Sequence, residues 1–220
     1  HDRFVVKNIL HFGVPNGIEG SMFQLGKILL LSTVSVLGTA SVAANAIGNT
    51  LASFQVVPGT ALGLAIVTVV SRCVGASEYD RARYYTKKMM RTAYLYTVLV
   101  IALILACLPL ILKLYNVSDQ AREWATQILW MHGLCGILIW PLAFTLPQAL
   151  RAAGDTRFTM VASTVSMWTL RVGLGVLLGR YWGFGVLGIW MAMFADWALR
   201  AALFVPRFHG HKWETMGLEN

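Results

Sequence analysis

Residues 13–38, GVPNGIEGSMFQLGKILLLSTVSVLG, are apolar enough for a membrane interior, yet the first half of this stretch carries Glu19, Gln24 and Lys27. On a helix, one stripe with spacings of four, three and four is entirely apolar: Ile18, Met22, Leu25 and Leu29. Another face holds Asn16, Glu19, Gly20, Phe23, Gly26 and Lys27. We therefore expect a membrane helix with one face toward lipid and one toward protein or water.

The composition of the whole chain agrees with this expectation. Apolar residues make up 57% and charged residues 13% of the chain, against about 45–50% and about 25% in a soluble domain. A helix needs about 20 largely apolar residues to cross a bilayer. Six segments are long enough, near 13–38, 42–71, 92–115, 125–149, 158–179 and 184–206. The sequence therefore predicts an all-α, polytopic membrane protein in which residues 1–220 form a single six-helix transmembrane bundle.

The net charge of +8 does not indicate nucleic-acid binding, because the cations sort by side of the membrane. The tails and loops that would share one side hold Arg3, Lys7, Arg72, Arg81, Arg83, Lys87, Lys88, Arg91, Arg151, Arg157, Arg207 and Lys212. The opposite loops hold only Lys113, Arg122 and Arg180. Since Lys and Arg are enriched on the cytoplasmic side, we expect a multi-pass plasma-membrane protein with both termini in the cytoplasm.

The loop between the second and third predicted spans has a helical pattern of its own. In residues 77–91, SEYDRARYYTKKMMR, one face carries Tyr79, Ala82, Tyr85 and Met89, and the cations lie elsewhere. This pattern favours a short amphipathic helix lying on the anionic cytoplasmic leaflet, in contact with membrane lipid. A solvated connector that obeys the same charge rule explains the cations equally well.

Three prolines inside predicted spans, Pro58, Pro141 and Pro147, each remove a backbone donor and are expected to disturb their helices. They free the carbonyls of Phe54, Ile137 and Ala143. In a membrane each freed carbonyl needs another partner or a place on a cavity wall.

Side-chain sets typical of enzymes are not found in the sequence. No nucleophile, paired carboxylates or metal-ligand cluster has a suitable spacing, so we expect neither catalysis nor a cofactor. Cys73, Cys107 and Cys135 are scattered in or beside apolar segments and are interpreted as packing residues. The sequence opens on His1 with neither an initiator methionine nor a signal-peptide pattern, which suggests a chain cut from something longer.

Six segments in order resemble a known family: GVPNGIEGSMFQLGKILL, GTASVAANAIGNTLASFQVVPGTALGLA, VGASEYDRARYYTKK, LPQALRAAGDTRF, SMWTLRVGLGVLLG and AMFADWALRAALF. Together they are similar to the multidrug and toxic compound extrusion (MATE) transporters. The resemblance implies two six-helix lobes around a central cavity. It also implies that this chain is the C-terminal lobe, whose partner would be the N-terminal six-helix lobe.

The resemblance implies a role for Glu19, because an acidic residue on the corresponding helix binds the coupling cation or the cationic substrate in several branches. Some branches also carry an aspartate where this chain has Trp140 and Pro141. A sodium site built from two carboxylates, as in those branches, is therefore in doubt here. The coupling ion is expected to be a proton or sodium.

The buried charges need partners, because an ionised side chain at the bilayer centre costs about 2.5–3.5 kcal/mol even on the lenient insertion scale. Glu19 and Lys27 lie eight residues apart, roughly 12 Å of helix rise, so a tight pair is not expected. Lys27 is either a structural counter-charge or a group that tunes Glu19. For Asp196, pairing with Arg171 or with Arg200 at the i+4 position favours a structural role.

A cavity wall that attracts lipophilic cations is expected from aromatic faces and a carboxylate. The candidate substrate-binding residues are Glu19, Phe23, Asn45, Asn49, Phe54 and Trp140. Phe144, Trp168 and Trp190 are further aromatic candidates, each with plain packing as the other interpretation. Asn45 and Asn49, one turn apart, either hydrogen-bond between helices or line the cavity.

We therefore expect secondary active export of small organic cations in exchange for protons or sodium, by alternating access of two lobes. A second hypothesis is flipping of lipid-linked saccharides, whose anionic head would favour a cation-rich cavity; Glu19 counts against it. A third is a half-size or structural membrane subunit that transports nothing.

Overall fold

We describe the chain from a computed structural model that covers residues 3–216, without the side chains of residues 3–5, 7, 8, 11 and 12. The side chains of Arg3 and Lys7, two cations of the predicted asymmetry, lie outside the described part. Every regular element in residues 3–216 is helical, and the three labelled η are π-helices: α1 (Arg3–Val36), α2 (Thr39–Gln55), α3 (Val57–Gly75), α4 (Tyr79–Leu114), α5 (Asp119–Leu138), η1 (Pro141–Thr145), α6 (Pro147–Ala152), α7 (Thr156–Ser166), η2 (Met167–Leu174), η3 (Leu177–Tyr181), α8 (Gly185–His209) and α9 (Lys212–Thr215).

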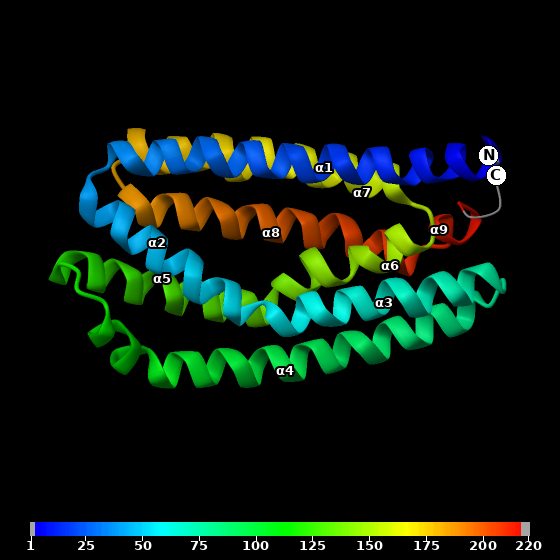
Figure 1. Ribbon diagram of the computed structural model, residues 1–220, viewed down its shortest axis with the longest axis horizontal. Coiled ribbons are helices and arrows are strands. Elements are labelled where there is room, and N and C mark those ends of the chain that lie inside the picture. The colour runs from blue at the N-terminus through cyan, green and yellow to red at the C-terminus, as the bar shows by residue number, and fades with distance from the viewer. Residues whose placement is uncertain (1–2, 217–220) are drawn as a thin grey trace.

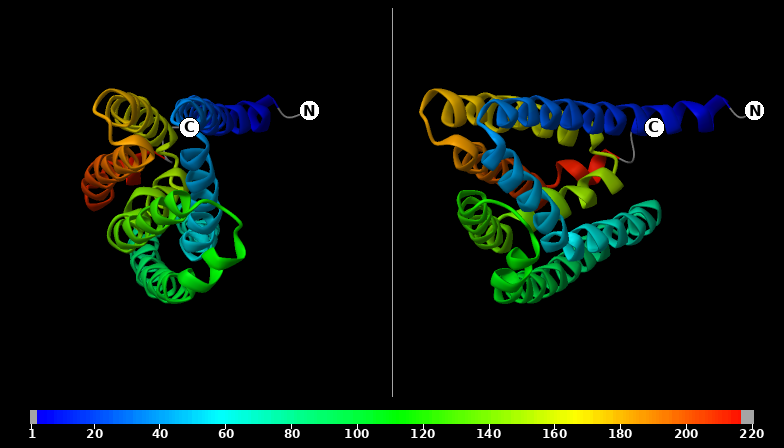
Figure 2. Two further views of the ribbon diagram at one scale, coloured as in Figure 1. Left: turned by 90° about the vertical axis from the view of Figure 1, so that its left-hand side faces the viewer. Right: turned by 60° about the vertical axis from the view of Figure 1, so that its left-hand side comes forward.

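The helices run back and forth along one long axis and cross the bundle six times (Figure 1). The passes are α1; α2 with α3; α4; α5 with η1 and α6; α7 with η2 and η3; and α8. Both termini and the α3–α4 and α6–α7 turns lie at one end of the bundle, which we call the terminal end. The other turns lie at the opposite end. Seen end-on, α1 and α7 lie side by side at one edge and α4 lies at the other (Figure 2).

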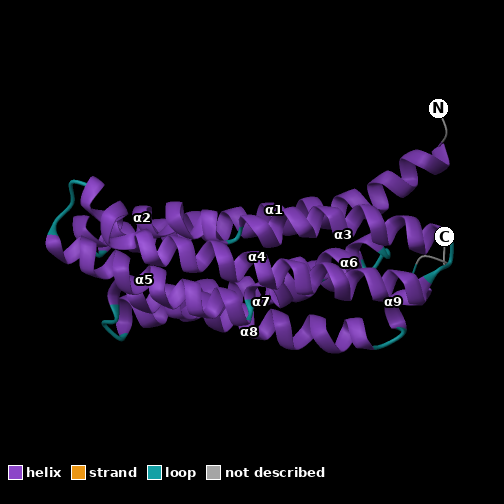
Figure 3. Cartoon of the chain, turned by 90° about the horizontal axis from the view of Figure 1, so that it is seen from below, coloured by secondary structure: helices purple, strands orange, loops and turns teal. Residues whose placement is uncertain are grey.

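Length and hydropathy identify fewer spans than the path of the chain does. Within the described residues, four helices are long and apolar enough to cross a membrane: Val57–Gly75, Tyr79–Leu114, Thr156–Tyr181 and Gly185–His209. Asp119–Leu138 and Pro141–Ala152, bent by 61°, make a fifth when counted together. The sixth pass, α1, is not among them, and Glu19, Gln24 and Lys27 interrupt its apolar stretch. Figure 3 shows that it nevertheless packs along the bundle, with its first turns projecting beyond it.

Both bent passes break beside a predicted proline. α2 and α3 are separated at Val56, next to Pro58, and the N–H of Val56 donates to the carbonyl of Phe54. One of the three freed carbonyls thus has a partner. In the other pass, Pro141 opens a π-helical turn directly after the bend.

The two bends lie against each other. Thr145 donates its hydroxyl hydrogen to the carbonyl of Gly59 at 3.0 Å, in a buried contact between η1 and α3. A Cβ on Gly59 would lie 2.3 Å from the Trp140 ring, so only glycine allows the helices to approach this closely. The bends are therefore held in place by packing.

The amphipathic segment 77–91 is not a separate surface helix, and that prediction is wrong. It forms the first turns of α4, which continues unbroken for 36 residues to Leu114. The buried positions Ala82, Thr86 and Met90 extend the stripe that packs against the bundle. Of the predicted apolar face, Ala82 is buried against the bundle, whereas Tyr85 is 39% exposed, so protein covers only part of that face.

The apolar core has two parts. One lies among α2, α5 and α8 toward the opposite end and includes Leu51, Ile128, Leu129 and Trp197. The other joins α3, the start of α4, α6 and the end of α8 at the terminal end and includes Ile66, Leu150, Phe204 and Trp213.

Arg83 on α4 anchors the C-terminal segment at the terminal end. Its Nε lies 2.6 Å from Glu214 Oε1, and its terminal nitrogens donate to the carbonyls of Phe208 (3.1 Å) and Gly210 (2.7 Å). Its guanidinium also lies 5.1 Å from the ring centroid of Trp213. Burial tends to raise the pKa of Glu214, but hydrogen bonds from His211 and Arg83 outweigh it and hold the pKa below its usual value.

Replacing Arg83 with alanine should release this segment, because the last α8 carbonyls and Glu214 lose a charged donor. We expect a loss of about 2–3 kcal/mol in local stability and faster tryptic cleavage after Lys212. Arg81→Ala is the matched control, since the Arg81 side chain is 69% exposed and pairs only with Glu78 on the surface. An Arg83→Ala protein cleaved at the parental rate would contradict this role.

Candidate functional site

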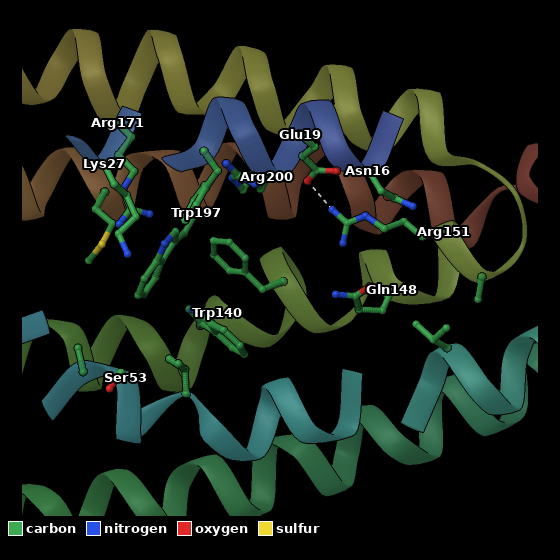
Figure 4. A pocket seen from close by; sticks show the side chains of 18 of the residues that line it. Asn16, Glu19, Lys27, Ser53, Trp140, Gln148, Arg151, Arg171, Trp197 and Arg200 are labelled. Carbon is green, nitrogen blue, oxygen red and sulfur yellow. Dashed lines mark hydrogen bonds and ion pairs between the residues drawn. The ribbon is translucent and has the colours of Figure 1, made fainter. Parts of the chain in front are cut away.

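A cavity of about 940 Å³ lies inside the bundle and reaches the α3–α4 and α6–α7 turns (Figure 4). Side chains from every pass except α4 line it. The polar and aromatic lining residues are Asn16, Glu19, Phe23, Lys27, Asn49, Ser53, Ser71, His132, Trp140, Phe144, Gln148, Arg151, Arg171, Trp190, Trp197 and Arg200. The size suits a drug-sized organic molecule, since such pockets measure about 300–1,000 Å³.

The polar face of α1 forms one wall of this cavity. Every predicted member of this face lines the cavity except Gly26, which lies against Met167 of η2. The apolar stripe faces outward, where Ile18, Leu25 and Leu29 are exposed. The helical period of this segment therefore places Glu19 and Lys27 on the cavity wall.

Glu19 forms an ion pair with Arg151, which comes from α6 on the other side of the cavity (Figure 4). The two side chains are only 13% and 18% exposed. In the described part of the chain no ion pair joins Glu19 to Lys27, in agreement with their separation along α1. The sequence indicated Arg151 only as a cytoplasmic loop cation, and its pairing with Glu19 was not predicted.

The turn after α6 positions Arg151. Gly154 has φ of 97°, a backbone conformation that glycine adopts without strain, and it ends the helix there. The next residue, Asp155, accepts hydrogen bonds from Arg207 of α8 at 2.6 and 3.2 Å. The motif LRAAGDTRF thus fixes α6 to the end of α8 and directs Arg151 toward α1.

Asp196 is fully buried and binds both predicted arginines. Its Oδ1 lies 2.9 Å from Arg200 Nε and accepts from the Ser166 hydroxyl at 2.5 Å. Its Oδ2 lies 4.0 Å from an Arg171 terminal nitrogen. Asp196 therefore ties α8 to α7 and η2, while the two arginines extend from it into the cavity.

Aromatic rings in the cavity already contact these arginines. The Arg171 guanidinium lies 5.2 Å from the Phe23 ring centroid, and the Arg200 guanidinium lies 5.1 Å from that of Phe144. Trp140 stacks on Phe144, with ring centroids 5.2 Å apart. Phe23 and Trp140 are thus both at the cavity, as the sequence predicted.

The other candidate residues of α2 differ in whether they reach the main cavity. Asn49 lines the cavity and donates to the carbonyl of Asn45 at 2.9 Å, while the Asn45 side chain accepts from Trp190 Nε1 at 3.1 Å. Phe54 is 56% exposed and lines a separate outer groove with Leu51 and Ile104. The structure does not bring Phe54 to the main cavity, because Ala52 and Ser53 of α2, and Val56 at the break after it, face the cavity instead.

A second cavity of about 530 Å³ adjoins the first and extends toward the opposite end. It extends along α1 as far as Val34. Five residues line both cavities: Lys27, Asn49, Arg171, Trp190 and Met193. These residues mark the junction of the two spaces.

The buried pair of His132 and Gln55 was not predicted. His132 Nδ1 lies 2.5 Å from Gln55 Oε1, and the imidazole also contacts the rings of Trp190 and Trp197 edge-on. Polar side chains in two apolar spans were the available signal, but nothing in the sequence shows that they meet. Within the described residues, no group of three or more His, Cys, Asp or Glu side chains is placed to hold a metal ion.

Comparison with known proteins agrees with this architecture. The family model MatE matches residues 15–177. The chain belongs to the MatE family. The chain is therefore an integral membrane protein of the MATE transporter family, and its helical bundle has the fold of about half of such a transporter.

Curated MatE relatives are about twice as long as this chain. A probable multidrug resistance protein, NorM of Thermotoga maritima, is 26% identical over 208 residues, which cover 94% of this chain and 45% of that protein. Another, YoeA of Bacillus subtilis, is 25% identical and covers 97% of this chain and 46% of its own length. The chain therefore spans about half the length of these relatives.

Solved MATE structures have the same fold. A crystal structure of MATE in the straight conformation superposes with a TM-score of 0.85 at 15% identity, over 98% of this chain and 48% of that one. A transporter of the MOP superfamily from Pyrococcus furiosus, described as having a binding pocket of reverse polarity, superposes with a TM-score of 0.78 at 20% identity, over 90% of this chain and 43% of its own.

Proposed function

We propose that the chain is the C-terminal six-helix lobe of a secondary transporter that moves an organic substrate in exchange for protons or sodium. The two adjoining cavities support this proposal, because together they extend along the bundle from the α3–α4 turn to Val34 near the opposite end. In transporters built from paired repeats, the substrate site lies near the membrane midplane at the interface between the repeats. The other lobe would close the exposed side of this path.

Glu19 is the proposed coupling group. It is the one carboxylate among the described lining residues of the main cavity, and its salt bridge to Arg151 links α1 to α6. Binding a cation at Glu19 would release Arg151, and the two helices would no longer be held together. One carboxylate with a guanidinium partner suits proton exchange better than a sodium site built from several oxygens.

The nature of the substrate follows from the charge of the cavity. Export of organic cations, the leading expectation from the sequence, needs a carboxylate that is free to meet them, whereas Glu19 is paired. The second hypothesis, flipping of a lipid-linked anion, is favoured by the cationic lining with Lys27, Arg171 and Arg200. The third hypothesis, a subunit that transports nothing, does not explain the two adjoining cavities.

Reconstitution of the transporter as its gene encodes it would test the proposal. Proteoliposomes would receive an imposed proton or sodium gradient, and uptake of anionic fluorescein and of cationic tetramethylrhodamine methyl ester would be followed. We expect gradient-driven accumulation of at least one dye, abolished by an ionophore and absent from protein-free liposomes. Equal movement of both dyes with and without protein would contradict a transport function.

Both termini are proposed to lie in the cytoplasm, because the cation-rich terminal end would then obey the positive-inside rule. Single cysteines at Tyr85, near the terminal end, and at Asp119, which is fully exposed at the opposite end, would test this. In a background without Cys73, Cys107 and Cys135, an impermeant thiol reagent should label Asp119→Cys but not Tyr85→Cys in intact cells. The reverse labelling pattern would invert the topology.

A further inference from the structure

The charged lining of the main cavity is mostly cationic. Among the described lining residues, Glu19 faces four cations: Lys27, Arg151, Arg171 and Arg200. Asp196 lies behind the wall and neutralises one more positive charge, since it pairs with Arg200 at 2.9 Å. With Arg151 paired to Glu19, and Asp196 shared between Arg200 and the more distant Arg171, an excess of positive charge remains around Lys27 and Arg171.

These two cations lie where a solute would pass. Both line the main cavity and the second cavity, so they stand at the junction between the two. They come from the neighbouring helices α1 and η2, and Figure 4 shows both side chains at the same side of the cavity. Arg171 is 4.0 Å from Asp196, beyond hydrogen-bond distance, and no ion pair of Lys27 is found in the described part of the chain.

Two hydrogen-bond donors on this wall also lack partners. The indole N–H of Trp197 and the Nε–H of Arg171 have no acceptor among the described residues, and Trp197 is only 2% exposed. A buried donor without an acceptor is unfavourable, because it has lost its hydrogen bonds to water. The one carboxylate oxygen nearby without a hydrogen bond, Asp196 Oδ2, is not on the lining and faces Arg171. Trp197 and Arg171 therefore each present a donor without an acceptor, and an oxyanion would supply one.

Two of the aromatic rings that would attract an organic cation, Phe23 and Phe144, already contact arginines. Phe23 has the guanidinium groups of Arg171 and Arg200 at 5.2 and 5.9 Å, and Phe144 has that of Arg200 at 5.1 Å. A cationic ligand would compete with these arginines and face the charges of Lys27 and Arg171. Such like-charge contacts oppose binding.

From these contacts, and resting on the transport function proposed above, we infer that the substrate is an organic anion. Its carboxylate, phosphate or sulfonate group would bind between Lys27 and Arg171 and accept a hydrogen bond from the indole of Trp197. Its apolar or aromatic body would lie against Trp140 and Met193. Arg171 offers a planar guanidinium that suits such oxyanions.

Two dyes of similar shape and opposite charge test this inference, with binding measured in detergent and transport in proteoliposomes. Fluorescein should bind and be transported, whereas tetramethylrhodamine methyl ester should do neither. Transport of the rhodamine without fluorescein would overturn the inference and leave the transport function intact. Fluorescein binding without any dye transport would support the anion site and contradict the transport function. Binding of neither dye would overturn the anion site.

Variants identify the groups involved. Lys27→Gln should weaken fluorescein binding about tenfold, the loss of one charge-assisted contact. Trp197→Phe keeps a ring but removes the donor and should weaken binding about threefold to tenfold. Lys113→Gln, an exposed cation on α4 outside both cavities, is the matched control. Folding is monitored by size-exclusion chromatography. Unchanged fluorescein affinity in folded Lys27→Gln and Trp197→Phe would overturn the inference.

Competition distinguishes a soluble anion from a lipid head group. A soluble aromatic carboxylate, salicylate, and a polyisoprenyl phosphate in mixed micelles would each compete with bound fluorescein. Displacement by salicylate alone assigns a water-soluble anion, and displacement by the polyisoprenyl phosphate alone assigns a lipid-linked one. If neither competitor displaced bound fluorescein, even in large excess over the dye, the result would contradict an oxyanion site.

Discussion

Replacing Asp196 with asparagine should remove most of the folded protein from the membrane. Asp196 is fully buried, and its charge is matched by Arg200 at 2.9 Å, with Arg171 at 4.0 Å. The amide keeps the shape but leaves two guanidinium groups without a counter-charge. Removing one partner of a buried ion pair costs about 3–5 kcal/mol, a large share of a stability of about 5–15 kcal/mol.

Folded protein would be measured by fluorescence-detected size-exclusion chromatography and by melting temperature. Asp119→Asn is the matched control, because Asp119 is fully exposed and makes a surface pair with Arg122. Arg200→Gln should be more damaging than Arg171→Gln, since Arg200 is closer to Asp196 and also donates to the Ser163 carbonyl at 3.0 Å. Normal abundance of folded Asp196→Asn with abolished transport would reassign Asp196 to the transport mechanism.

Replacing Glu19 with glutamine should uncouple transport from the ion gradient. The substitution keeps the size of the side chain and its position beside Arg151, but removes both the charge and the ability to bind a proton. Coupling free energies of about 1–3 kcal/mol correspond to about 5–150-fold, so gradient-driven transport should fall by that factor. Protein abundance should change little, because Arg151 is partly exposed and remains solvated.

Two further variants test this pair. Glu19→Asp keeps a carboxylate and should retain part of the activity with an altered pH profile. Arg151→Gln keeps the Glu19 carboxylate but removes the salt bridge that cation binding is proposed to release, so its gradient-driven transport should also fall. Transport would be followed at several pH values with protein levels measured in parallel. If Glu19→Gln kept the parental transport rate and pH profile, Glu19 would have a structural role and would not be the coupling group.

Local patterns in the sequence determined much of the architecture. The spacing of Ile18, Leu25 and Leu29 against Glu19, Phe23 and Lys27 determines which face of α1 meets the cavity, because a helix places residues three and four apart on one side. The apolar runs and prolines likewise indicated six passes and two of their breaks.

Tertiary structure decided which of these faces meet. Arg151 reaches Glu19 across 132 positions of sequence, and His132 reaches Gln55 across 77, so no helical period relates them. Phe54 and the start of α4 show the same limit, because a period identifies an apolar face without showing whether lipid, a groove or another helix covers it. The charge that the cavity presents also depends on which ions pair, and the packing of α6 against α1 and of η2 against α8 brings Arg151 to Glu19 and Arg171 to Asp196.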